Sequence, residues 1–219
     1  MNLWEKKRMQ VEAKHATEYG GRLADPSEAT QVKLMLRQHM RDLKKVQSFE
    51  RKAVYKRKAL PLYETWITET LKNQSGVQDD VLMYLMLWSF DAGVYEQGLD
   101  IAEYALKHQL VMPDNQARTT GCAIAEEMGD RAKDAYTAKN PIPLEVLQRT
   151  MSLTEHEDMP DKVRGELHKW LGYSLRDHGF PQPALCELMR ALELNDRSGV
   201  KADIKQLEKI LSAPNNADS

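Results

Sequence analysis

The sequence has little cysteine and no long apolar segment. Only Cys122 and Cys186 occur among 219 residues, far apart and without metal-ligand spacing, which excludes a disulfide scaffold and favours two small core residues of a cytosolic protein. No apolar run approaches the roughly 20 residues that span a bilayer. The first residues lack the apolar centre of a secretion signal. We therefore expect the protein to stay in the cytoplasm where it is made.

The sequence also lacks segments that alternate apolar and polar residues with β-branched enrichment, so no sheet is expected. Apolar residues at helical spacing instead predict an all-α fold. We expect four regions: a mobile N-terminal arm over 1–25, a long basic helix over 26–60, a body of helical hairpins over 61–211 and a disordered tail over 212–219. In the body, helices are predicted near 62–71, 81–93, 94–109, 119–136, 143–153, 160–177, 181–192 and 199–211.

Residues 26–60 contain no glycine and no proline after Pro26, so the pattern predicts one uninterrupted helix of about 50 Å. Apolar residues recur there at steps of four and three, which is typical of the seam of a coiled coil or a long hairpin. His39 is a polar member of this seam. The predicted association residues are Val32, Leu36, Leu43, Val46 and Phe49, and they predict a homo-oligomer.

Charge is distributed unevenly along the chain. Residues 1–60 carry 15 Lys/Arg and 7 Asp/Glu, a balance of +8, whereas the remainder carries −10. Such asymmetry favours a nucleic acid or another anionic partner for the basic part; the alternative is that a long exposed helix is simply charged. The candidate DNA-binding residues are Arg37, Arg41, Lys44, Lys45, Arg51, Lys52, Lys56, Arg57 and Lys58.

Two predicted hairpins resemble each other at an offset of 86 residues. Gly93 corresponds to Gly179 and Ala105 to Ala191, with leucine pairs at 85/171, 99/185 and 106/192. The WLGY run at 170–173 followed by ALEL at 191–194 is similar to a tetratricopeptide unit, although the spacing is not the 34-residue period of an array. Two antiparallel helix pairs and a peptide-binding groove both remain open readings.

No catalytic, cofactor or metal signature is found in the sequence. A metal-dependent nuclease would place carboxylates and a lysine on a hairpin of strands, whereas Asp161 and Asp203 lie in helical patterns. Gly93 and Gly98 have the spacing of a phosphate loop but lack the following lysine and hydroxyl. His156, Asp158, Asp161 and His168 could gather as ligands, but an acidic helix start explains Asp158 more simply.

Several motifs together resemble one protein family. They are KALPLY at 58–63 with Trp66, QDDVLM at 78–83, MLW at 86–88, DAG at 91–93, IA at 101–102, YALK at 104–107, MP at 112–113, LT at 153–154, DMPD at 158–161, LHK at 167–169, LRD at 175–177 and GVK at 199–201. They are similar to the small terminase subunits of temperate, contractile-tailed phages with cohesive ends. The resemblance spans roughly 27–210 and is most specific over 78–113.

This resemblance implies a protein that recognises the packaging site on phage DNA and works with a large ATPase subunit in the infected bacterium. Small terminases of other phages form rings, and the family is labelled an endonuclease subunit. The absence of a nuclease signature suggests that the cutting residues belong to the large partner. Two alternatives remain: a helical-hairpin adaptor that binds a peptide, and a genuine nuclease.

Overall fold

The computed structural model describes residues 26–113 and 118–212. Over these residues the chain is helical and forms no strand, which confirms the all-α class. None of the helices in this part is long and apolar enough to cross a membrane. The chain divides into two compact units, one up to Thr120 and one from Gly121 onward. The predicted mobile arm over 1–25 and nearly all of the predicted tail lie outside the described residues.

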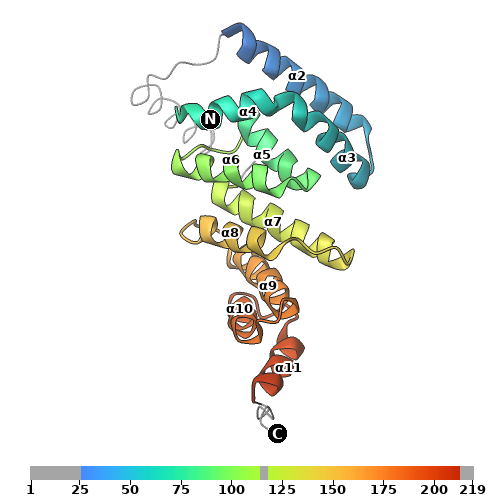
Figure 1. The fold of residues 1–219 in the computed structure, drawn as a ribbon, viewed down its shortest axis with the longest axis vertical. Coiled ribbons are helices and arrows are strands. Elements are labelled where there is room, and N and C mark those ends of the chain that lie inside the picture. The colour runs from blue at the N-terminus through green and yellow to red at the C-terminus, as the bar shows by residue number, and fades with distance from the viewer. Residues whose placement is uncertain (1–25, 114–117, 213–219) are drawn as a thin grey trace. The chain divides into compact units, whose positions relative to one another are not determined.

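The prediction of one uninterrupted helix over 26–60 is wrong, because the chain turns at residues 46–48. Helix α2 spans Pro26–Lys45 and α3 spans Phe49–Ala59 (Figure 1). Ser48 is the N-cap of α3: its backbone is extended and its side chain accepts a hydrogen bond from the Arg51 amide. The turn lets both helices pack on α5, which a straight helix could not do. Of the two structures that the apolar seam predicted, a coiled coil or a hairpin, the chain forms the hairpin.

The rest of the first unit packs around one apolar helix. A short 3₁₀ segment, η1 (Leu60–Tyr63), leads into α4 (Glu64–Asn73), followed by α5 (Asp80–Ala92) and α6 (Tyr95–Lys107). Nearly every side chain of α5 is buried, as its continuous apolar run predicts. Asp79 caps α5 by accepting hydrogen bonds from the Val81 and Leu82 amides, and the Trp66 indole donates a third. Burial nevertheless raises the pKa of the Asp79 carboxyl.

The second unit contains α7 (Thr120–Thr137), which starts at its boundary, α8 (Leu144–Thr154), α9 (Asp161–Asp177), α10 (Pro181–Leu194) and α11 (Lys201–Ser212). Arg176 ties three of them together. Its guanidinium donates to the Tyr136 hydroxyl at 2.7 Å and to the Asp203 carboxylate at 3.0 Å. Tyr173 also donates to Asp203, and burial beside that carboxylate raises the pKa of Tyr173 to about 12.

The two hairpins that resemble each other in sequence are both antiparallel helix pairs, α5 with α6 and α9 with α10. Gly93 and Gly179 follow the first helix of each pair with φ of 73° and 82°, a left-handed conformation that favours glycine. Ala105 and Ala191 are fully buried on the second helix of each pair. The similarity in sequence between the two hairpins therefore reflects a repeated helix–glycine–helix unit, with one copy in each half of the chain.

Candidate nucleic-acid interface

One side of α2 carries a stripe of exposed cations. Lys33, Arg37, Arg41 and Lys45 recur at steps of four, and Lys44 lies beside them, so all five project from one stripe of the helix. Each of the five is exposed. Lys45 binds the Asp42 carboxylate at 2.8 Å, and this contact together with Gln38 lowers the pKa of Asp42. The stripe adjoins the buried face of α2 and leaves its cations available to an external anion.

Helix α3 carries the remaining basic residues, and the structure separates them into two groups. Arg51 and Lys58 are exposed to solvent, and Lys52 is half-buried. Lys56 instead forms an ion pair with Asp91, with its side chain only 15% exposed. Arg57 donates through Nε to the carbonyl oxygen of Ala92 at 2.8 Å and donates to it again through Nη2. Both residues therefore hold α3 against the end of α5.

His39 explains why the apolar seam has a polar member. Its Nδ1 lies 2.8 Å from the Tyr63 hydroxyl, and its ring meets the rings of Tyr55, Tyr63 and Trp88 within 6.2 Å. Helices α2, α3, η1 and α5 therefore meet at this imidazole. Burial lowers the pKa of His39 despite the opposing charge of Asp42, so the docked hairpin favours the neutral ring.

The predicted association residues differ in how far they are buried in their own chain. Leu36 and Leu43 are buried inside their own chain, at 5% and 8% exposure, whereas Val32 and Val46 are half-buried. Phe49 lies at the turn and is 86% exposed. Sequence reasoning missed Leu34 and Val54, which are exposed apolar side chains on α2 and α3. A signal for the turn was present, because Ser48 followed by an acidic first-turn residue is a helix-start pattern.

The four possible metal ligands of the second unit are not brought together. Among the described residues, no three His, Cys, Asp or Glu side chains are grouped to hold a metal ion. His168 Nδ1 lies 2.6 Å from the Glu187 carboxylate, and His156 lies in the turn that follows α8. The N-cap of α9 is Pro160 and has no side-chain cap, so Asp158 does not fill that position, while Asp161 is the acidic residue of the first turn.

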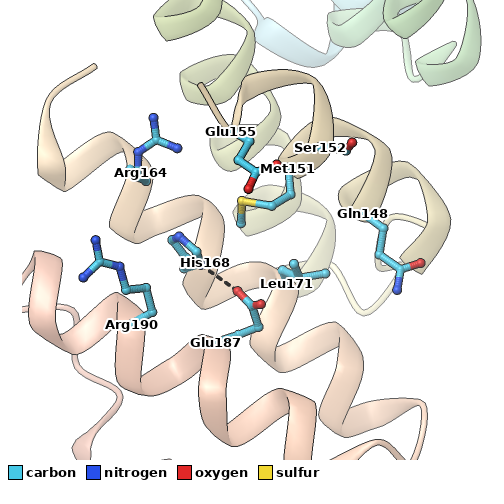
Figure 2. Close-up of a pocket in the computed structure, with 9 residues that line it drawn as sticks. All are labelled: Gln148, Met151, Ser152, Glu155, Arg164, His168, Leu171, Glu187 and Arg190. Carbon is cyan, nitrogen blue, oxygen red and sulfur yellow. Dashed lines mark hydrogen bonds and ion pairs between the residues drawn. The ribbon is translucent and has the colours of Figure 1, made fainter. Parts of the chain in front are cut away.

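A cavity of about 700 Å³ lies between α8, α9 and α10 of the second unit (Figure 2). The His168–Glu187 pair forms part of its wall. Arg164 donates to the carbonyl oxygens of Thr154 and Glu157, which closes the end of α8. The lining mixes both charges with apolar groups and comprises Gln148, Met151, Ser152, Glu155, Arg164, His168, Leu171, Glu187 and Arg190. Such a lining suits a polar peptide but does not select an anion.

Comparisons with known proteins agree on one family. The family described as "Phage small terminase subunit" matches residues 33–162, which include most of α2 and all of α3 to α8. The chain is 41% identical over 181 residues to the "Terminase, endonuclease subunit" of Escherichia phage P2, an alignment that covers 83% of this chain and 73% of that protein. The search of solved structures gives no match.

Proposed function

Because the chain belongs to the phage small terminase subunit family, we propose that it binds the cohesive-end packaging site on concatemeric viral DNA. In this proposal it recruits a large subunit that carries the ATPase and cuts the DNA. The setting is the cytoplasm of the infected bacterial host. The observation that carries the proposal is the exposed cation stripe of α2, continued by Arg51, Lys52 and Lys58 of α3.

The hairpin formed by α2 and α3 supplies the DNA contact. Residues 26–60 carry ten Lys/Arg and three Asp/Glu. In the described part of the chain, Lys45 and Lys56 bind carboxylates and Arg57 binds a backbone carbonyl oxygen. Cations on a firmly docked hairpin attract phosphates and fix the position of the duplex, although phosphate contacts alone do not read base sequence. Lys56 and Arg57 act here by positioning α3, and the other candidate residues contact phosphates.

Self-association is the second part of the proposal. Leu36 and Leu43 already contribute to the core of their own chain, so of the predicted seam a second copy has access to the half-buried Val32 and Val46 on this side of the hairpin. The exposed Leu34 and Val54 extend the apolar surface that is open to such a copy. A ring or smaller oligomer would repeat the basic hairpin along the duplex, which raises the effective affinity without new contacts.

The large subunit is proposed to dock on the acidic remainder of the chain. Residues 61–219 carry a net charge of −10, and the cavity between α8 and α10 offers both charge signs to a peptide. This cavity is also the observation that favours the alternative function, a helical-hairpin adaptor without DNA binding. The name of the phage P2 relative includes an endonuclease activity; we assign the cutting step to the large subunit and no catalytic residue to this chain.

The solution mass of the full-length chain, measured by light scattering with and without a duplex that contains the packaging site, tests both parts. We expect a mass above one copy for the protein alone and a further increase with DNA at low salt. A monomer that ignores duplex DNA at low salt but captures an extended peptide would contradict the proposal and support the adaptor. Magnesium-dependent nicking by this chain alone would contradict the assignment of the cutting step.

A further inference from the structure

Phe49 has the highest exposed fraction of the large apolar side chains that the structure describes, at 86%. It is the first residue of α3 and follows the turn at residues 46–48 directly. Tertiary packing does not account for a ring in this position, since almost all of its surface faces water. Figure 1 shows the turn at the end of the hairpin that α2 and α3 form, and Phe49 is the exposed aromatic residue that directly follows this turn.

Four cations lie within five residues of Phe49 in the sequence, two on each side of the turn, and we call them the collar. Lys44 and Lys45 end α2, and Arg51 and Lys52 lie in the first turn of α3. The Lys52 ammonium lies 5.4 Å from the centre of the Phe49 ring. Asp42 and Glu50 are the acidic residues of this segment, and Asp42 is already engaged by Lys45. The turn thus combines a planar apolar face with an excess of positive charge.

This combination favours a nucleic acid over a two-fold contact between the Phe49 rings of two copies. In a two-fold contact the same surface appears on both partners, so two Phe49 rings in contact would bring two cation collars together. The positive charges of the two collars would then repel one another. A nucleic acid offers the complement of both features: phosphates for the collar and base faces for the ring.

The hairpin also holds the backbone that bears this ring in a fixed place before any partner arrives. Ser48 caps α3, Lys56 and Arg57 fasten α3 to the end of α5, and His39 fixes α2 against η1 and α5. A contact residue on a fixed support loses little conformational entropy on binding. The turn is therefore suited to enter a base stack, which a freely moving loop would do at greater cost.

We propose that Phe49 is an aromatic wedge that stacks against a base step of the duplex while the collar of Lys44, Lys45, Arg51 and Lys52 holds the flanking phosphates. This inference rests on the proposed function and adds to it the mode of binding. Apolar wedges of this kind partly unstack a base step and kink the duplex. The protein would thus deform DNA locally as well as neutralise it.

The test compares binding to a fully paired duplex and to the same duplex with one mismatched pair. A mismatch lowers the cost of unstacking, so the full-length protein should prefer the mismatched duplex roughly tenfold or more. Phe49→Ala should lose this preference and bind roughly 5- to 150-fold more weakly, with an unchanged salt slope. Phe49→Trp should keep the preference. Leu62→Ala, which truncates another exposed apolar side chain of the first unit, is the matched control.

Equal binding of both duplexes by the unmodified protein, or a preference retained by Phe49→Ala, would overturn the inference while leaving DNA binding intact. A lower solution mass of Phe49→Ala without DNA would overturn it in favour of a contact between copies. If the unmodified protein binds neither duplex at low salt, the proposed function fails, and the wedge fails with it.

Discussion

Neutralising the cation stripe of α2 should reduce the salt dependence of DNA binding by an amount set by the number of cations removed. The variant is Arg37→Gln, Arg41→Gln and Lys44→Gln, three exposed side chains outside the core. If about five phosphates are contacted, the logarithm of affinity falls with that of salt with a slope near −4.5. Removing three contacts changes the slope to about −1.8.

The difference is large enough to measure by fluorescence anisotropy with a labelled duplex. Between roughly 50 mM and 200 mM salt, the unmodified protein should lose about 500-fold in affinity and the variant about 12-fold. The matched control is Lys201→Gln, Lys205→Gln and Lys209→Gln, which removes the same charge from an exposed stripe on α11. An equal change of slope in both triple variants would refute the assignment of phosphate contacts to α2 and leave only a net-charge effect.

Three further outcomes follow from the packing. Gly172→Ala places a methyl group 2.7 Å from a buried leucine and should lower the free energy of unfolding in urea by about 1–2 kcal/mol. Gly129→Ala meets only an ordinary van der Waals contact, 3.9 Å from the Glu166 Cβ, and should raise the free energy of unfolding by about 0.5–1 kcal/mol. Lys56→Ala removes the charge-assisted bond that fastens α3 to α5, so it should lower the free energy of unfolding by about 1.5–3 kcal/mol and speed amide exchange in α3. Burial lowers the pKa of His39 in the folded protein, so folding favours the neutral ring. The contribution of this ring to the free energy of unfolding is complete above the pKa of the unfolded state, about 6.5, and declines as pH falls below that value. His39→Gln should remove that part of the pH dependence.

Local patterns predicted the helices of the body well. Asp79, Gly93 and Gly179 lie at helix ends because their chemistry acts within a few residues, by capping amides or by adopting a positive φ. The apolar run of α5 predicted burial on nearly all sides, and the structure confirms it. These features depend on neighbours in sequence, so they could be read without knowledge of the fold.

The turn at residues 46–48 was missed because it depends on contacts that are distant in sequence. Ser48 alone is a weak signal, and the absence of glycine and proline argued for continuity. The turn is stabilised by the packing of α2 and α3 on the rest of the first unit. His39 contacts Tyr63, 24 residues further along the chain, and Lys56 contacts Asp91, 35 residues further along. The same contacts changed the candidate site, since charge counting could not distinguish the anchored Lys56 from the exposed Lys44.

Lysine footprinting by mass spectrometry tests the central claim most directly. The protein is acetylated with and without a duplex that contains the packaging site, and the reactivity of each lysine is compared. We predict that DNA protects Lys44, Lys52 and Lys58, while Lys205 and Lys209 of α11 react equally in both samples. Unchanged reactivity on α2 and α3 together with protection on α11 would contradict the claim that the basic hairpin holds the DNA.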